Sequence, residues 1–337
     1  MSEVLVDVRG LRKVFPMRRG LLQTDKMELP AVDGVDLEIP AGQTLALVGE
    51  SGSGKTTFAR CLLRLLEATD GEVRFEGEDL FGLSARRLRR ERRKFQMVFQ
   101  DPYGSLNPRM RVGEILAEPL AVHQVGSPKT RSERVGELLE LVGLPREAAR
   151  RFPHEFSGGQ RQRIAIARAL APEPIFLVAD EPVAALDVSV RAQVLNVLSR
   201  LQERFQLTLL LIAHDLAVVG QMADRVAILY FGRLVEVGPT ARLLGAPQHP
   251  YTVNLLACAP APDPSLRRPS AVLSSEKANP INLPAGCALH PRCPAATELC
   301  RTQRPALLEI DTGHEVACHH PGDVEVGVIP GSGNGTF

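Results

Sequence analysis

The hydrophobic positions of the chain change their spacing along its length, and each spacing predicts a different kind of structure. Residues 1 to about 80 alternate apolar with polar positions in short runs separated by turn residues, as β-strands do. From about 84 to 150 the apolar residues recur at helical spacing among many charged ones, as in RSERVGELLELVGL. We interpret this part as an inserted helical subdomain that extends over about 84–170.

Three almost wholly apolar runs predict strands that are buried on both faces, as in a parallel sheet. We expect these strands at 44–48, 175–179 and 208–213, and helices at 57–66, 160–170 and 190–205. Strands and helices of these lengths in alternation predict an α/β fold with a mostly parallel sheet that helices cover on both faces.

Beyond residue 258 the pattern ends in a proline-rich stretch that cannot hold regular structure. The sequence therefore predicts a core domain over 1–258, followed by a proline-rich wrap and a cysteine-rich extension over 259–322. The last residues, 323–337, include PGSGNGTF and are expected to form a disordered tail.

Composition and charge narrow the classes of function. The 337 residues suit one large domain with an appendage, and a formal net charge of +1 argues against a global attraction to nucleic acid. The basic run RRLRRERRK at 86–94 lacks interleaved aromatic residues that could stack bases, so we expect a solvated helix face there rather than a contact with nucleic acid or an anionic membrane.

The chain is expected in the cytoplasm. No run approaches the roughly 18 apolar residues of a membrane span. The start, MSEVLVDVRG, alternates apolar with polar residues and carries acids, which predicts an edge strand and not a secretion signal.

The segment GESGSGKT directly follows the first apolar strand and predicts a loop that binds the phosphates of a nucleotide. Its glycines let the backbone curl so that N–H groups point inward at the phosphates, and the next helix adds its positive dipole end. Lys55 is expected to reach the terminal phosphates, and the hydroxyl of Thr56 is placed to ligate Mg²⁺. The expected nucleotide-binding residues of this loop are Gly49, Glu50, Ser51, Gly52, Ser53, Gly54, Lys55, Thr56 and Thr57.

Two further sites carry residues suited to phosphoryl transfer. Asp180 and Glu181 end the second apolar strand, where α/β sheets present their ligands, so Asp180 fits a partner of Mg²⁺ and Glu181 fits the carboxylate that orients or deprotonates the attacking water. An acidic pair at a strand end is by itself more often a helix cap. Gln100, where strand-like RKFQMVFQ meets the helical part, is a candidate for sensing Mg²⁺ or the attacking water.

A second glycine-rich run lies between the phosphate loop and the acidic pair, and we call it the signature run: Ser157, Gly158, Gly159 and Gln160. A phosphate loop alone occurs in nucleotide binders of many kinds, whereas these three motifs in this order are typical of one ATPase class. The chain resembles the ATP-binding-cassette proteins. The resemblance implies a P-loop cassette core with N-terminal antiparallel strands, an inserted helical subdomain and a small cysteine-rich C-terminal extension.

The resemblance also implies roles for single residues. The run 157–160 closes over the ATP of a second subunit, so Ser157 and the Gly159 amide complete the phosphate cage only in a dimer. His214 stands at the place of the switch histidine that contacts the terminal phosphate. Asp187, in the loop 184–187, matches the residue that couples the two subunits.

Two aromatic residues also stand at positions that the family pattern defines. Phe15 is the candidate for stacking on adenine, because the family places an aromatic residue upstream of the phosphate loop. Phe156 stands where leucine is commoner before the signature run, and we expect it to face packing rather than phosphate.

Four of the six cysteines crowd into the C-terminal segment, where their spacing is C-x5-C-x6-C-x17-C. In a reducing compartment such a cluster is expected to bind metal rather than to form disulfides. The paired C-x2-C knuckles of most structural zinc sites are missing, and four thiolates suit a [4Fe–4S] cluster or Zn²⁺; four reduced cysteines without metal are the alternative. The cysteines are Cys287, Cys293, Cys300 and Cys318, with His290, His314, His319 and His320 as competing ligands. Cys61 and Cys258, in apolar helical contexts, are expected in the core.

The end of the chain narrows the resemblance, which covers about residues 1 to 320. HPYTVNLLACAPAPDP and GCALHPRCP look like the tail of the ATPase subunits that drive bacterial dipeptide and oligopeptide import, and QDPYGSLNPRM and DEPVAALDVSVRAQVLNVL are similar to the same group. Some members hold an iron–sulfur cluster in that tail, which favours [4Fe–4S] over Zn²⁺. The stretch from Phe15 to Ala31 resembles the second of the two unlike ATPases that such importers often carry.

The resemblance implies an ATP-hydrolysing subunit on the cytoplasmic face of the cell membrane, bound peripherally. Its expected partners are a second, homologous ATPase subunit in a heterodimer, two transmembrane permease subunits and, indirectly, a substrate-binding protein, with no nucleic acid. Gln100 and the residues after it are the expected coupling surface.

Three alternatives stay open at this point. Related members import nickel or oligosaccharides. DNA-maintenance ATPases share the three motifs, but they split the two halves with long coiled-coil or zinc-bearing insertions, and no heptad array lies between Lys55 and Ser157 here. A metal-sensing regulator built on a cassette core has only the cysteine-rich tail in its favour.

Overall fold

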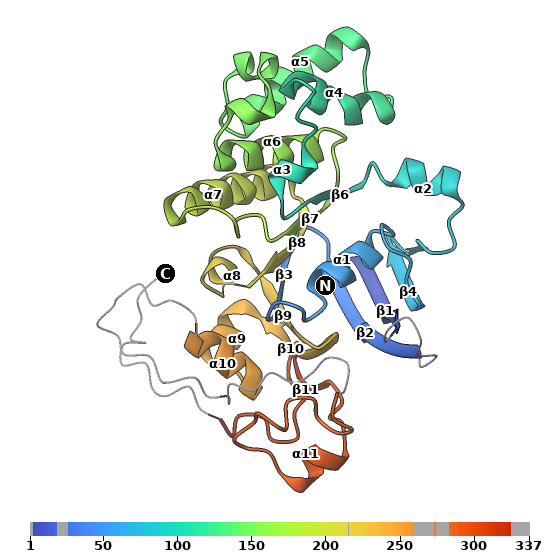
Figure 1. The fold of residues 1–337 in the computed structure, drawn as a ribbon, viewed down its shortest axis with the longest axis vertical. Coiled ribbons are helices and arrows are strands. Elements are labelled where there is room, and N and C mark those ends of the chain that lie inside the picture. The colour runs from blue at the N-terminus through green and yellow to red at the C-terminus, as the bar shows by residue number, and fades with distance from the viewer. Residues whose placement is uncertain (1–2, 19–25, 215, 259–272, 274–282, 325–337) are drawn as a thin grey trace.

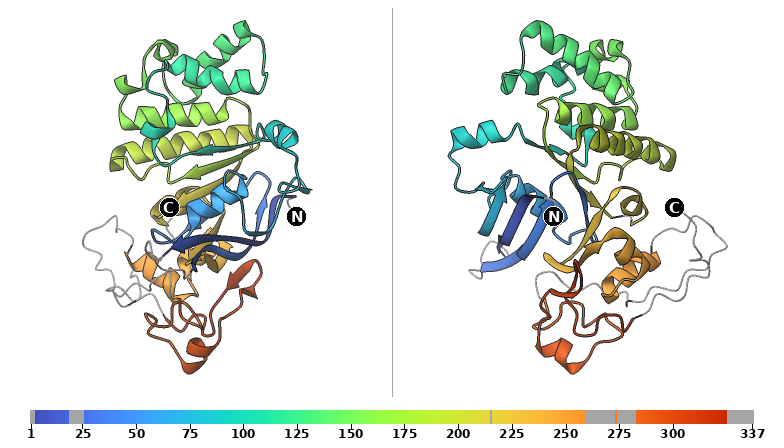
Figure 2. Two further views of the ribbon diagram at one scale, coloured as in Figure 1. Left: turned by 45° about the vertical axis from the view of Figure 1, so that its right-hand side comes forward. Right: turned by 180° about the vertical axis from the view of Figure 1, so that it is seen from behind.

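The structure of the protein is a computed structural model that describes residues 3–18, 26–214, 216–258, 273 and 283–324. An eight-stranded sheet runs through the centre, and a four-stranded antiparallel sheet lies to one side of it (Figure 1). Helices gather at one end of the molecule and the cysteine-rich segment lies at the other, an arrangement that Figure 2 shows in two further views. The predicted wrap at 259–282 lies outside the described residues except for Leu273, as does the predicted tail from residue 325 on.

Five neighbouring strands of the central sheet are parallel, as the apolar runs predicted. Every residue of three of these strands is buried, so both faces of this part of the sheet are covered. The predicted strands at 44–48 and 208–213 are confirmed residue for residue, and the third is displaced by one residue. In sheet order the five strands are β9 (Arg225–Tyr230), β3 (Thr44–Val48), β8 (Thr208–Ala213), β7 (Phe176–Asp180) and β6 (Phe95–Val98).

The sheet as a whole is mixed, because three antiparallel strands extend it beyond β9. β10 (Arg233–Pro239) pairs with β9, β12 (His314–Val316) pairs with β10, and β11 (Leu308–Asp311) forms the edge. The segment expected to be a separate cysteine-rich extension therefore continues the main sheet. The sequence did not predict β11 or β12, because they are short and every residue of β11 is exposed, which removes the alternating signal.

Outside β3 and the helix that follows it, the strands predicted in the first 80 residues are confirmed and are antiparallel. Their buried residues, such as Val8 and Leu11, pack with Phe58 of the first helix into one core, so this sheet supports the start of that helix. The sheet order is β2 (Lys26–Pro40), β1 (Val4–Arg18), β4 (Asp70–Phe75) and β5 (Glu78–Asp79), and the helix is α1 (Lys55–Leu62).

Most helices between residues 85 and 205 form the group at one end (Figure 1), where apolar residues such as Leu116, Leu139 and Ile164 share a core. These helices cover the segment interpreted as an inserted subdomain, whose limits at 84 and 170 stay predictions. The group consists of α3 (Pro102–Ser105), α4 (Val112–Val122), α5 (Pro128–Leu141), α6 (Gly158–Leu170) and α7 (Val188–Phe205), with 3-10 turns at Arg146–Arg150 and Pro153–Glu155. The remaining helix, α2 (Ala85–Glu91), lies apart from the group, and its Leu88 packs into the core of the four-stranded sheet.

Four shorter helices follow along the chain. Within the described ranges, no helix is both long enough and apolar enough to cross a membrane. Cys61 is buried in α1 as predicted, whereas Cys258 is exposed, so its expected place in the core is wrong. The remaining helices are α8 (Leu216–Met222), α9 (Thr240–Gly245), α10 (Pro250–Cys258) and α11 (Glu298–Thr302).

Candidate functional site

The loop between β3 and α1 has the backbone that the phosphate-loop prediction requires. Gly52 and Gly54 have φ angles of +84° and +107°, in the left-handed region that favours glycine. A Cβ on Gly54 would lie 2.1 Å from the carbonyl oxygen of Ala31, so no larger residue fits there. The loop therefore curls tightly into the N-terminus of α1, where backbone N–H groups and the helix dipole favour phosphate.

Lys55 folds back over this loop. Its Nζ donates hydrogen bonds to the carbonyl oxygens of Gly49, at 2.7 Å, and Glu50, at 2.9 Å. Lys55 is only 5% exposed, and desolvation lowers the pKa of its ammonium, although the nearby carboxylates of Glu181 and Asp180 oppose that shift. The buried cation lies where the terminal phosphates of a nucleotide on this loop would need it.

A hydroxyl and a carboxylate meet beside the loop. Thr56 Oγ1 donates a hydrogen bond to Asp180 Oδ1 at 3.0 Å, because β7 and β3 both end at this edge of the sheet. Burial raises the pKa of Asp180, while the bond from Thr56 acts in the opposite direction. These oxygen donors are of the hard kind that Mg²⁺ prefers, so the pair fits the predicted magnesium ligands.

Of the three residues predicted to act in hydrolysis, Gln100 and His214 lie against the carboxylate of the third, Glu181. Gln100 Nε2 donates to Glu181 Oε2 at 2.9 Å, and His214 Nδ1 lies 3.6 Å from the same oxygen. Each residue follows the end of a different parallel strand, and these ends lie at one edge of the sheet. The sequence could place each residue after its strand, but only the strand order β8-β7-β6 brings the three side chains together.

Glu181 has an unusual backbone. Its φ angle is +43°, in the left-handed region where a non-glycine residue is strained, and its backbone N–H donates to the carbonyl oxygen of Ile212 at 3.0 Å. That hydrogen bond to β8 fixes the residue in this conformation. Its carboxylate is thereby turned toward Gln100 and His214.

The signature run forms the start of α6. Ser157 Oγ accepts a hydrogen bond from the backbone N–H of Gln160 at 3.4 Å, and Gln160 Oε1 accepts one from the Ser157 N–H at 3.0 Å, which is a capping box. A Cβ on Gly159 would lie 2.2 Å from Val190 Cγ1. Close packing against α7 therefore explains a glycine at this position, a reason the sequence alone could not give.

The signature run lies apart from the phosphate loop of its own chain. Figure 1 shows α6 within the helical group and α1 beside the small sheet. Ser157 is exposed, as is Asp187 at the start of α7. The closure of this run over a second subunit's ATP stays a prediction, and so does the role of Asp187.

The two aromatic residues have different surroundings. Phe156 is 4% exposed, which confirms that it faces packing, and the guanidinium of Arg151 lies 4.4 Å from its ring centroid. Phe15 is partly buried on β1, with Lys13 Nζ 5.2 Å from its ring centroid. Stacking of Phe15 on adenine stays a prediction.

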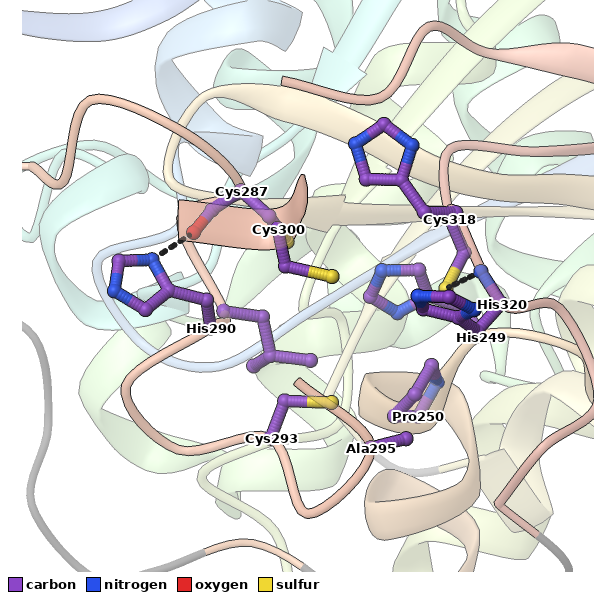
Figure 3. Close-up of a pocket in the computed structure, with 11 residues that line it drawn as sticks. His249, Pro250, Cys287, His290, Cys293, Ala295, Cys300, Cys318 and His320 are labelled. Atoms are coloured by element: carbon purple, nitrogen blue, oxygen red, sulfur yellow. Dashed lines mark hydrogen bonds between the residues drawn. The ribbon is translucent and has the colours of Figure 1, made fainter. Parts of the chain in front are cut away.

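The four clustered cysteines line one pocket at the far end of the molecule (Figure 3). They are free thiols, and Figure 3 shows them placed around a common space with His249 and His320 at its side. Burial raises the pKa of Cys287 and Cys293, and raises that of Cys318 to about 11; the neighbouring thiols add to each shift. Thiolates at this place would need a cation to balance their charge.

The predicted metal site is not borne out as such. Within the part of the chain that the structure describes, no group of three or more His, Cys, Asp or Glu residues is arranged to hold a metal ion. The histidines named as competing ligands have other hydrogen-bond partners. These pairs are His290 Nδ1 with the Cys287 carbonyl at 3.0 Å, His314 Nε2 with Glu236 at 2.8 Å, His319 Nε2 with the Gln303 carbonyl at 3.1 Å and His320 Nε2 with Thr297 at 2.9 Å.

Two residues outside the predicted site touch the phosphate loop. Tyr251 Oη accepts a hydrogen bond from the backbone N–H of Glu50 at 2.7 Å, and Arg292 Nη1 lies 3.7 Å from Glu50 Oε1. Both come from far along the chain, so no local pattern could show them. The motif HPY, at 249–251, was the available signal, although it did not reveal the contact.

Known protein families match both the part of the chain that carries the phosphate loop and the C-terminal part. The ABC transporter family matches residues 32–184, and the C-terminal region of oligopeptide/dipeptide transporters matches residues 235–300. A probable peptide ABC transporter ATP-binding protein, y4tS of Sinorhizobium fredii, is 49% identical over 95% of this chain and 90% of its own length. The oligopeptide transport ATP-binding protein AppF of Bacillus subtilis is 47% identical over 94% of this chain and 98% of its own.

A further relative and a solved structure are also similar to this chain. The dipeptide transport ATP-binding protein DppF of Haemophilus influenzae is 47% identical over 94% of this chain and 96% of its own length. The ATP-binding cassette MJ0796, solved as a dimer in a post-hydrolysis state with ADP and Pi, superposes with a TM-score of 0.62 at 30% identity. That match covers 70% of this chain and 98% of MJ0796.

Proposed function

This chain belongs to the ABC transporter ATPases, in the group with the C-terminal region of oligopeptide and dipeptide transporters, and on that premise we propose that its ATP hydrolysis powers the uptake of dipeptides or oligopeptides. The observation that carries the proposal is the convergence of Gln100 and His214 on Glu181, beside a phosphate loop. Several relatives are named for peptide import, which favours peptides over nickel, oligosaccharide or DNA maintenance.

ATP binding is assigned to the loop 49–57. Backbone N–H groups of the loop and the start of α1 hold the phosphates, and Lys55 neutralises the terminal ones. Thr56 and Asp180 would hold Mg²⁺, with Gln100 within reach of the same edge of the sheet. When bound, Mg²⁺ neutralises the charge that develops on the phosphate oxygens.

Hydrolysis is assigned to Glu181. Its carboxylate, held by Gln100 Nε2, orients the attacking water and accepts its proton, and His214 stands beside the same oxygen to contact the terminal phosphate. Phosphoryl transfer depends mostly on positioning and charge stabilisation, so a carboxylate that Gln100 holds in place is well suited to this task.

Assembly completes the site in this proposal. Two homologous ATPase subunits, expected to be a heterodimer, close so that each signature run covers the partner's ATP, and two permease subunits bind on the cytoplasmic face of the membrane. A substrate-binding protein delivers the peptide. The exposed Ser157, at the N-terminus of α6, supports this role because its hydroxyl is accessible to a phosphate that another subunit carries.

Contacts within the helical group connect the proposed coupling surface, which would meet a permease subunit, with the signature run. Tyr103, which follows Gln100 in the proposed coupling surface, is 63% exposed. Arg161 of α6 stacks on it with its guanidinium carbon 4.1 Å from the ring centroid, and Arg168 of the same helix donates to the carbonyl oxygen of Ser105. A movement of this surface is therefore passed directly to the helix that begins with the signature run.

Transport itself tests the proposal. In vesicles that contain the assembled importer, a peptide-loaded binding protein is expected to stimulate ATP hydrolysis several-fold, because ligand binding outside favours closure of the ATPase pair. Lys55→Ala, which removes the phosphate-binding cation, serves as the inactive control. Stimulation by nickel or an oligosaccharide instead of peptide would show that the assigned substrate class is wrong.

We also propose that Cys287, Cys293, Cys300 and Cys318 hold a [4Fe–4S] cluster, with Zn²⁺ as the alternative. The donor set supports it: four thiols line one pocket while the candidate histidines bond elsewhere. Four thiolates around one Zn²⁺ would lie within about 4 Å of each other. A [4Fe–4S] cluster is larger than a single ion, so its four thiolates lie farther apart than those around one Zn²⁺, and its content of iron and sulfide distinguishes it from Zn²⁺.

Metal analysis decides between these states. The full chain purified without oxygen is expected to contain about four iron and four sulfide per chain, with broad visible absorption. Cys293→Ser is expected to lose most of both, whereas Cys258→Ser, which removes an exposed thiol outside the pocket, keeps them. Zinc without sulfide would show that the four cysteines hold a structural Zn²⁺ instead of the cluster. The absence of both iron and zinc would refute metal binding.

A further inference from the structure

A buried polar network fixes the segment that leads into α10. Glu236 is fully buried, and its carboxylate accepts hydrogen bonds from the backbone N–H groups of Gln248, at 2.9 Å, and His249, at 3.0 Å, and lies 2.8 Å from His314 Nε2. His249 Nδ1 in turn accepts from the backbone N–H of Tyr251 at 3.1 Å. Because buried polar groups are costly when unpaired, this network holds Tyr251 firmly in one position.

Tyr251 connects this network to the phosphate loop. Its side chain is fully buried, its ring centroid lies 4.5 Å from that of Tyr230, and its Oη accepts from the Glu50 N–H at 2.7 Å. The Glu50 N–H and the Gly49 carbonyl belong to one planar peptide unit. That carbonyl accepts the hydrogen bond from Lys55 Nζ at 2.7 Å. The same peptide plane is therefore held by Tyr251 on one side and binds Lys55 on the other.

Arg292, from the cysteine-rich segment, reaches the same loop residue by a second route. It is 8% exposed, and its Nη1 lies 3.7 Å from Glu50 Oε1 and 3.5 Å from Tyr230 Oη. A cation held at this depth requires a compensating group, and the Glu50 carboxylate is one such group. Both the backbone and the side chain of Glu50 are thus restrained by the C-terminal part of the chain.

We propose that Tyr251 and Arg292 are positioning residues for the phosphate loop, which hold the Gly49–Glu50 peptide so that Lys55 is set to receive the terminal phosphates of ATP. The inference rests on the phosphate-binding role proposed above for Lys55. It makes the C-terminal region a working part of the nucleotide site, acting through the loop without touching the nucleotide.

Removing the tyrosine hydroxyl tests the first contact. In the full chain assembled with its partner subunits, Tyr251→Phe removes the hydroxyl that accepts from the Glu50 N–H and so releases the Gly49–Glu50 peptide from α10, and the Kd for ATP and the KM are expected to rise about tenfold. The kcat is expected to stay within about twofold, because Glu181 and Gln100 are untouched. The matched control is Thr252→Val, which removes the neighbouring buried hydroxyl; that hydroxyl has no hydrogen-bond partner among the described residues.

A double-mutant cycle tests the second contact and does not depend on the tyrosine variant. Arg292→Met and Glu50→Gln are each expected to weaken ATP binding about threefold, and the double variant no more than either single one. A fully additive effect would show that the two side chains act independently and would overturn the role of Arg292.

The outcomes separate this inference from the proposed function. If the wild-type chain fails to bind ATP, or Lys55→Ala binds it equally well, the function of the loop is wrong. If Lys55→Ala loses binding but Tyr251→Phe binds ATP as tightly as wild type, the inference alone is overturned. It is overturned as well if Thr252→Val weakens ATP binding as much as Tyr251→Phe, because the effect would then be general loosening of α10.

Discussion

Glu181→Gln is expected to lower the rate of ATP hydrolysis in the assembled complex by about 100-fold or more while ATP stays bound. The amide keeps the shape of the carboxylate and an oxygen that can accept from Gln100 Nε2, so the site should keep its geometry. It loses the negative charge that orients the attacking water and takes its proton. Since opening of the ATPase pair follows hydrolysis, the variant should also accumulate as a closed dimer.

Single-turnover hydrolysis and the amount of ATP retained after gel filtration measure this result. Glu173→Gln is the matched control, because it makes the same change at a surface carboxylate whose partners are Arg93 and Arg134, outside the site. Hydrolysis at the wild-type rate in the assembled complex would refute the role assigned to Glu181.

Gly159→Ala is expected to reduce hydrolysis by a similar factor through a different cause. The new methyl group would lie 2.2 Å from Val190 Cγ1, so the start of α6 must move away from α7. The signature amides would then miss the partner's phosphates, and loss of such donors costs about 100-fold or more. Binding of ATP by the chain's own phosphate loop should be unchanged, which equilibrium binding to the isolated chain can measure.

A second substitution identifies the cause. Val190→Ala removes the methyl group that obstructs the new side chain, so Gly159→Ala combined with Val190→Ala is expected to recover at least about tenfold of the lost rate. Gly245→Ala is the control, because a Cβ there has no neighbour within 4 Å. A double variant no better than the single one would place the requirement for glycine at the phosphates and not at α7.

The sequence by itself determined the elements whose signal is local. The strands β3 and β8 were predicted to the residue, because a run of apolar residues buried on both faces leaves a continuous pattern. The phosphate loop, the acidic pair and the signature run were each recognisable from residues within a few positions of one another. Their chemistry needs particular residue types at fixed spacing, and such spacing is preserved in the linear chain.

Only the tertiary structure decided how these parts meet. It brought Gln100, Glu181 and His214 together through the order of three strands, and it added β11 and β12 to the main sheet. It also placed Tyr251 against Glu50. These contacts join residues far apart in the chain and depend on which faces pack and which buried polar groups find partners. A local sequence pattern cannot predict these contacts, because the free energy that favours them arises only when the whole core is assembled.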